Sequence, residues 1–149
     1  MPDKQRWEAT AFLDTFVLDR ALSRLLLKAF AGTSITPVDY ALYSSIQTGA
    51  PRTATAIAQD LHVPLTTMTD WIAAPVRRGH VTRVRSPHDG RAWLLTLTDE
   101  GTAALTEGRA AFGRAYEAFL AHSSLGTDEL RATLTQMTRA IDRASDDLD

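Results

Sequence analysis

The sequence of 149 residues contains no cysteine, so it can form neither a disulfide bond nor a thiolate metal site. No apolar run approaches the roughly 20 residues that a membrane-spanning helix needs, so no membrane partner is expected. The first residues, Met1–Arg6, lead into no apolar signal core, which argues against secretion. We therefore expect a cytoplasmic protein.

The motifs of common enzyme active sites are also missing. The chain has no Gly-x-Ser-x-Gly nucleophile elbow, no phosphate-binding glycine loop and no His-Glu-x-x-His zinc motif. Its histidines are scattered and lack the spacing of metal ligands. Ser86, His88 and Asp89 lie within one turn, where their side chains do not easily line up as a nucleophile relay. We expect no enzyme, no catalytic residue, no bound metal and no cofactor.

The charge of the chain is small but unevenly distributed. A net charge of −2 argues by itself against a nucleic-acid partner. Residues 52–91, however, carry six Lys/Arg against three Asp/Glu, whereas residues 92–149 carry five against ten. The central excess of positive charge fits a nucleic-acid-binding surface, and an ordinary solvated face is the alternative.

The spacing of apolar residues predicts that most of the chain is helical. A long first helix extends from Trp7 to Phe30. The pattern Thr36-Pro37-Val38-Asp39 predicts the start of a second helix, with a hydroxyl cap and a proline at the first helical position. The second helix ends near Thr48. Further helices are expected at residues 54–61, capped by Thr53, at 65–78, ended by Gly79, and at about 99–121 and 127–147.

Between the helices expected at 65–78 and 99–121, the pattern changes to that of a β-hairpin. Two short segments rich in β-branched and aromatic residues, Val81–Arg85 and Ala92–Leu97, flank the turn-forming residues Pro87–Gly90. Thr98 offers a hydroxyl cap for the next helix, and acidic residues follow on its first turn, where the helix dipole favours them. The hairpin therefore leads directly into a long helix.

Helix, short helix, turn, helix and hairpin, in that order, are typical of a winged helix-turn-helix. We predict a mainly α fold with a small β-hairpin wing, in a single domain of residues 1–149. Residues 34–98 form the winged helix-turn-helix, and residues 7–31 and 99–147 form N- and C-terminal dimerisation helices. These outer helices carry more apolar surface than one small domain covers. The alternative is that they fold back into a larger monomeric core.

The helix expected at 65–78 has two distinct faces at about 100° per residue. Short side chains on its exposed face allow a close approach to base edges, and threonine or alanine methyl groups suit the thymine methyl group. Arg77 and Arg78 at its far end suit phosphate. An ordinary amphipathic helix is the alternative. The apolar arc comprises Leu65, Met68, Trp71, Ile72, Pro75 and Val76, and the exposed face comprises Thr66, Thr69, Asp70, Ala73 and Arg77.

Nearly the whole chain resembles the MarR family of transcriptional regulators. The family pattern combines a leucine-containing turn, a Ser/Thr-rich recognition helix, a strand and a wing that leads into a helix. Each piece alone is weak, but the combination is specific. The matching segments are Ile35-Thr36-Pro37, Leu61-His62-Val63, Thr66-Thr67-Met68-Thr69, Gly79-His80-Val81-Thr82-Arg83, Ser86-Pro87-His88-Asp89-Gly90-Arg91 and Leu97-Thr98-Asp99-Glu100-Gly101.

The resemblance implies a homodimer on double-stranded DNA, with paired recognition helices in successive major grooves of a pseudo-palindromic operator. Arg91 matches the wing arginine that enters the minor groove, and Asp89 matches the aspartate that orients it. A plain hairpin ion pair is the alternative for this pair. Further DNA-binding candidates are Thr66, Thr67 and Thr69 at the family's Ser/Thr positions, Asp70 and Arg77 on the same helix, His88 in the wing, and Arg52 in the turn before the short helix.

Three residues depart from the family pattern. Asp70 stands where many members carry arginine, and its carboxylate suits cytosine N4 better than phosphate. Gly90 replaces a common wing-tip arginine. Pro75 removes a helical hydrogen bond, so the recognition helix is expected to bend, or to end near Ala73. These departures bear on the strength and sequence preference of DNA binding.

The family resemblance also implies a small aromatic or phenolic effector that binds between the dimer helices and the winged domain. Phe30, Tyr40 and Tyr43 are the candidate lining residues, and a place in the core is the alternative for all three. Two functional hypotheses follow. The first is a dimeric, sequence-specific repressor or activator that an effector modulates. The second is a dimeric winged-helix interaction or ligand-sensing module with weak or lost DNA binding.

Overall fold

The computed structural model describes residues 2–49 and 51–148, with side chains from residue 10 onward. Both ends of the predicted domain, Met1 and Asp149, lie outside the described residues, as does the side chain of Trp7. The chain divides after Arg114 into two compact units.

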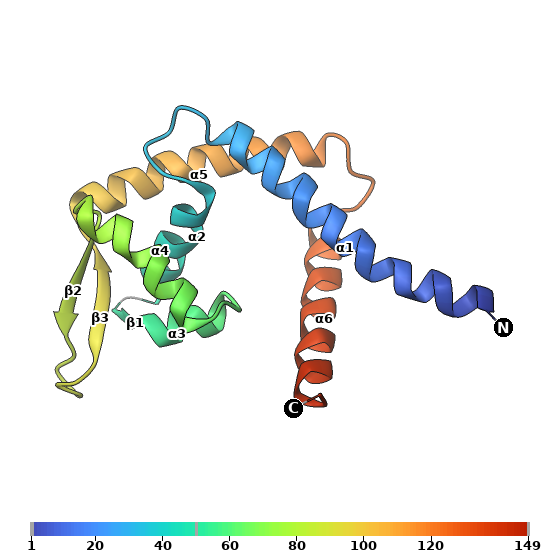
Figure 1. The fold of residues 1–149 in the computed structure, drawn as a ribbon. Helices are drawn as coiled ribbons and strands as arrows, with labels where there is room; N and C mark the ends of the chain where they lie inside the picture. The colour runs from blue at the N-terminus through green and yellow to red at the C-terminus, as the bar shows by residue number, and fades with distance from the viewer. Residues whose placement is uncertain (1, 50, 149) are drawn as a thin grey trace. The chain divides into compact units, whose positions relative to one another are not determined.

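The elements follow one another in the predicted order (Figure 1). Helix α5 begins in the first unit and ends in the second. The first helix begins before the predicted Trp7, and the other helices lie within a few residues of their expected ranges. The helices are α1 (Pro2–Ala29), α2 (Pro37–Thr48), α3 (Ala54–Asp60), α4 (Leu65–Arg77), α5 (Asp99–Leu120) and α6 (Thr127–Asp146).

The predicted hairpin is part of a three-stranded antiparallel sheet. Strand β2 (Val81–Arg85) pairs with β3 (Trp93–Leu97), as the sequence predicts. The other edge of β3 pairs with β1 (Arg52–Thr53), a two-residue strand that the sequence pattern does not predict. Two residues are too few to display the alternating pattern by which a strand is found in a sequence. The strand β1 ties the segment before α3 to the wing.

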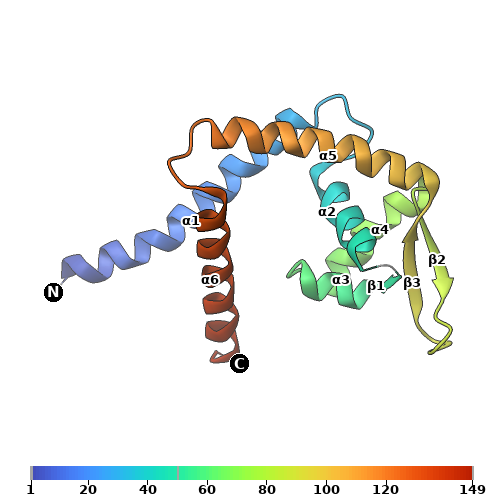
Figure 2. The same cartoon turned by 180° about the vertical axis from the view of Figure 1, so that it is seen from behind.

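Helices α2, α3 and α4 pack together beside the sheet, and the β2–β3 hairpin extends from its root at the start of α5 (Figure 1). Seen from behind, β1 lies beside β3 at the edge of the sheet near α3 (Figure 2). The core of this unit joins the helices to the inner face of β3. Its largest fully buried side chains are Leu42, Tyr43, Ile46, Ile57, Met68, Ile72, Pro75, Leu95 and Leu105.

The predicted helix caps are confirmed. The Thr36 hydroxyl accepts a hydrogen bond from the Asp39 backbone N–H, and the Asp39 carboxylate accepts one from the Thr36 N–H. Thr53 and Thr98 likewise cap α3 and α5. Gly79, which follows the predicted recognition helix α4, has φ = 75°, a conformation that favours glycine. Caps can be predicted because donor and acceptor are near neighbours in the sequence.

The expectation that the recognition helix ends near Ala73 is wrong. Helix α4 continues to Arg77 with Pro75 inside it. Helical hydrogen bonds continue beyond the proline. The Arg78 backbone N–H donates to the Ala74 carbonyl at 3.0 Å. Pro75 is fully buried, so the packing of its ring offsets the helical hydrogen bond that proline cannot make.

The apolar arc predicted on α4 faces the core except at its beginning, with Met68, Ile72 and Pro75 buried and Trp71 and Val76 partly buried. Leu65 is 51% exposed because it is the first residue of α4 and lies at the edge of the packed face. Met68 and Ile72, one and two turns later, are buried as predicted. The arc therefore orients the helix from Met68 onward.

The outer helices expose large apolar side chains. Phe12, Phe16 and Val17 on α1 are each more than 60% exposed. In the second unit, Leu134 and Ile141 on α6 are nearly half exposed. Water-exposed apolar rows of this size are typical of surfaces that another chain covers. Among the residues that the structure describes, no helix is both long and apolar enough to span a membrane.

Candidate functional site

The recognition helix presents a small, polar surface beside the wing. Thr66, Thr69, Asp70 and Arg77 are exposed, and Thr67 is half-buried. The Thr69 hydroxyl donates to the Leu65 carbonyl at 2.9 Å, which holds that side chain close to the helix. Since Thr69 is exposed and its hydroxyl oxygen can still accept a hydrogen bond, the residue remains available to a partner. This surface is shallow enough for a groove of DNA to approach the helix.

A compact turn at the wing tip holds Asp89 and Arg91. The Ser86 hydroxyl accepts from the backbone N–H of His88 and of Asp89, at 3.3 and 3.2 Å. The Asp89 carboxylate in turn accepts from the Arg91 N–H at 3.0 Å, and the Ala92 N–H donates to the Asp89 carbonyl. Asp89 therefore orders the backbone that carries Arg91. Both side chains and that of His88 are exposed at the tip.

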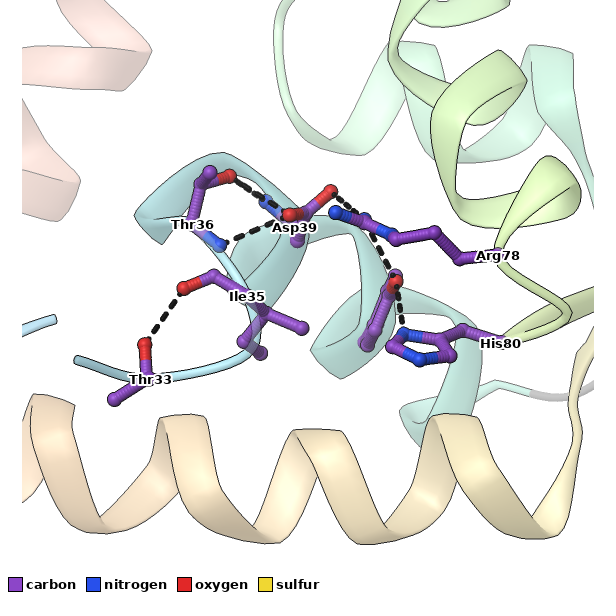
Figure 3. Close-up of polar contacts among 7 residues, drawn as sticks. Thr33, Ile35, Thr36, Asp39, Arg78 and His80 are labelled. Carbon is purple, nitrogen blue, oxygen red and sulfur yellow. Dashed lines mark hydrogen bonds and ion pairs between the residues drawn. The ribbon is translucent and has the colours of Figure 1, made fainter.

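The end of the recognition helix is joined to α2 by a polar network, drawn in Figure 3. Arg78 lies 2.8 Å from the Asp39 carboxylate and donates to the Tyr43 hydroxyl at 3.2 Å. The Tyr43 oxygen also lies 3.0 Å from Nδ1 of His80. Because that oxygen accepts from Arg78, its own proton is available to a neutral His80 imidazole. Arg78, predicted together with Arg77 to bind phosphate, is thus paired within the protein.

Burial and pairing within this network shift two ionisation equilibria. Burial raises the pKa of Tyr43 above its ordinary value of 10.0, and the hydrogen bond from Arg78 opposes part of that rise. Burial alone would lower the pKa of Arg78, but its hydrogen bonds to Asp39 and Tyr43 raise it overall. The sequence does not reveal this network, because its members come from α2 and from the residues that follow α4, far apart in the chain.

Arg52 is already paired within the protein. Its guanidinium lies 2.6 Å from the Asp60 carboxylate and donates to the Ser45 hydroxyl at 3.3 Å. The hydrogen bond from Arg52 lowers the pKa of Asp60 below its ordinary value. The Arg52 side chain is 19% exposed, so the pair joins β1 to α3 more than it offers a free cation. The proposed phosphate contact of Arg52 would have to compete with Asp60.

A hollow of about 540 Å³ lies within the first unit, against α2. Tyr40 and Phe112 form its aromatic wall, with ring centroids 5.0 Å apart. Phe30 packs behind Tyr40 at 5.8 Å and is itself buried. Tyr43 lies elsewhere, in the core and in the polar network. Of the three predicted lining residues, Tyr40 lines the hollow, whose other walls include Leu26, Ala41, Ser44, Ser45, Arg52 and Asp60.

No protein-family model and no curated protein matches the chain by sequence. Among solved structures, the repressor CouR bound to a 23-mer DNA duplex is 27% identical, with a TM-score of 0.67 over 86% of this chain and 91% of that one. The regulator PcaV of Streptomyces coelicolor, in complex with its natural ligand, is 25% identical, with a TM-score of 0.69 over 85% and 91%.

A mutant of MarR from E. coli, complexed with operator DNA, is 24% identical. Its TM-score is 0.77 over 93% of this chain and 98% of that one, so the likeness extends over almost the full length of both. These neighbours are transcriptional regulators, not enzymes. With the helix order, the three-stranded sheet and the wing described above, they show that the chain has the same winged-helix fold as these regulators.

Proposed function

We propose that this protein is a homodimeric transcriptional regulator that binds a pseudo-palindromic operator in double-stranded DNA and responds to a small effector. The observation that carries the proposal is the exposed row of Thr66, Thr69 and Arg77 on α4, in one unit with a wing that presents Arg91. A helix of this profile suits the major groove, and an arginine on a hairpin tip suits the adjacent minor groove.

The roles of the individual residues follow from their chemistry. Thr66, Thr67 and Thr69 offer hydroxyl and methyl groups to bases or to the backbone, and Arg77 offers charge to phosphate. Asp70 is exposed on the same surface, where a carboxylate accepts from cytosine N4 but is repelled by phosphate. His88 and Arg91 supply contacts at the wing, and Arg52 adds one only if it leaves Asp60.

Three further observations support a dimer and an effector. The exposed apolar side chains of α1, in the first unit, and those of α6, in the second, each supply a surface that a second copy would cover. The hollow beside Tyr40 and Phe112 has the aromatic wall that a small aromatic or phenolic molecule requires. The similar regulator PcaV was solved with its natural ligand, which supports a ligand-responsive function for this chain.

We further propose that the protein is not an enzyme and that it acts in the cytoplasm, where genomic DNA is accessible.

One observation favours the second candidate, an interaction or ligand-sensing module with weak DNA binding. Asp70 places a negative charge on the surface that would meet the phosphates. The single domain 1–149 is part of the proposal for both candidates.

Fluorescence anisotropy with duplexes from the upstream region of the protein's own gene, at several salt concentrations, tests the proposal. A regulator binds one fragment at least about 1000-fold more tightly than random duplex of equal length. Micromolar or weaker binding to every fragment, without preference over random duplex, would contradict DNA regulation and favour the second candidate. Sedimentation equilibrium at the same concentrations gives the number of chains per duplex.

A further inference from the structure

The wing contains a second arginine whose position differs from that of Arg91. Arg85, the last residue of β2, stands directly across the hairpin from Trp93, the first residue of β3. Its guanidinium carbon lies 4.3 Å from the centroid of the Trp93 ring. One guanidinium nitrogen of Arg85 donates to the Gly90 carbonyl at 2.5 Å. The side chain thus lies over the indole and reaches the wing tip.

These partners hold the charge of Arg85 without neutralising it. A carbonyl oxygen and an aromatic face are both uncharged, and the bond to Gly90 uses one of the five N–H donors of the guanidinium. Trp93 is 46% exposed and Arg85 is exposed as well, so the pair stands outside the buried core. A large aromatic side chain left half in water on a narrow hairpin suggests a surface that another molecule covers.

The neighbouring position in the turn leaves space for that molecule. A Cβ atom built on Gly90 meets no atom within 4 Å, and its backbone is outside the left-handed region that requires glycine. Neither crowding nor backbone strain therefore demands glycine at this position. Because glycine has no side chain, the wing tip is open at this position. The guanidinium of Arg85 lies there, bound to the Gly90 carbonyl.

We infer that the Arg85–Trp93 pair is a preset binding site for a DNA backbone phosphate, next to the groove that Arg91 enters. The inference rests on the proposed function and adds a residue pair to it. A planar guanidinium matches the oxygens of a phosphate, and stacking on a ring fixes its plane before DNA arrives. The charge is carried by the end of β2, beside the open turn at Gly90.

Salt-dependent anisotropy on the full chain tests this inference, with Arg85→Gln, Arg85→Lys and Trp93→Leu compared with wild type. We expect Arg85→Gln to weaken binding about tenfold on specific and random duplex alike, since it removes a charge-assisted hydrogen bond. It should also reduce the slope of log K against log salt by about 0.9 for each phosphate that is no longer neutralised. Arg85→Lys should retain that slope and recover part of the affinity.

Trp93→Leu separates the platform from the charge. Removal of the aromatic face should weaken binding about threefold with the salt slope unchanged, because the charge remains but its position is no longer set. Arg109→Gln is the charge-matched control, since Arg109 lies on α5, beyond the root of the hairpin, and donates to Gln47. It should bind as wild type does. Circular dichroism of each variant establishes that the fold is kept.

The outcomes distinguish this inference from the proposed function. If wild type itself fails to bind any duplex, the proposed function is wrong and the inference is wrong with it. If wild type binds and Arg85→Gln matches Arg109→Gln, the inference alone is overturned. A weakening confined to particular sequences, with an unchanged salt slope, would also overturn it, because Arg85 would then read bases. If Trp93→Leu bound DNA as tightly as wild type does, the proposed role of the Trp93 ring would be wrong.

Discussion

The carboxylate of Asp39, at the start of α2, lies 2.8 Å from the guanidinium of Arg78, at the end of the recognition helix. The Asp39 side chain is 9% exposed and also completes the capping box with Thr36. One buried carboxylate therefore both begins the helix that lines the hollow and anchors the helix proposed to read DNA. Because this ion pair joins the two helices, a movement of the first turn of α2 would also displace the end of α4.

Replacement of Asp39 by alanine should destabilise the fold by about 2–3 kcal/mol. The change removes the reciprocal cap and leaves the Arg78 guanidinium without its charged partner. Urea denaturation gives the free energy of unfolding. Thr36→Ala is the matched control, because it removes one side of the cap but keeps the ion pair, and should cost about 1 kcal/mol. Equal losses of stability for both variants would mean that the pair with Arg78 contributes nothing.

The raised pKa of Tyr43 predicts a loss of stability in alkaline solution. Since the folded protein holds this proton more tightly than the unfolded chain, its contribution is fully present below pH 10.0 and is lost as the pH rises through the folded-state pKa. Urea denaturation between about pH 8 and about pH 11 should show the decline. Tyr43→Phe, although less stable at pH 8, should decline less; a parallel decline of both proteins would refute the assignment.

Gly101 in α5 should not tolerate a side chain. A Cβ atom at this position would lie 2.0 Å from the carbonyl oxygen of His80, which also accepts a hydrogen bond from the Thr98 N–H. Gly101→Ala should therefore cost about 3 kcal/mol in free energy of unfolding, because the joint between wing and helix must shift. Gly113→Ala, at an open position of the same helix, should instead be neutral or stabilising by up to about 1 kcal/mol.

Substitutions in the wing and on the exposed face of α4 should have different effects in DNA-binding assays. Arg91→Ala should weaken binding broadly and flatten the salt dependence, since it removes a cation from the wing. Asp70→Ala should change the ranking of operator variants more than the overall affinity, because a carboxylate discriminates between bases and does not bind phosphate. Anisotropy against a panel of single-base operator variants measures both effects. Unchanged binding by Arg91→Ala would disprove the assignment of the wing.

Self-association should depend on the exposed apolar row of α1. Phe16 is 64% exposed, and a buried charge at a dimer interface is strongly unfavourable. Phe16→Glu should therefore shift the protein toward monomer in sedimentation equilibrium, while helix content by circular dichroism is unchanged. Asp14→Lys on the same helix tests whether any change of charge has this effect. A wild-type monomer at micromolar concentration would contradict the proposed homodimer.

The helices, their caps and the hairpin were predictable because each depends on near neighbours in the chain. Thr36 and Asp39 are three residues apart, and so are Thr98 and Gly101, which makes the capping pattern visible in sequence. The hairpin follows from two short apolar segments and the turn between them. The resemblance to the MarR family rests on the same local motifs.

Other features required contacts between distant segments. Pro75 predicted that the helix bends, or ends near Ala73, whereas α4 continues to Arg77 with the proline fully buried in the core. In the sequence Arg52 has the features of an exposed cation, but in the structure its guanidinium lies 2.6 Å from the Asp60 carboxylate. Tyr40 and Tyr43 have similar positions in the sequence pattern, yet one lines the hollow and the other joins the network with Arg78 and His80.

The sequence by itself determined the order of the elements, the places where the helices begin, and the presence of a wing. Helical period, capping and turn formation are local, so neighbouring residues suffice to decide them. The tertiary structure alone decided which charged side chains are engaged inside the protein and which remain for a partner. Arg78 and Arg52 are paired with carboxylates, while Arg85 lies over the uncharged ring of Trp93, because ion pairing and stacking depend on which segments the fold brings together.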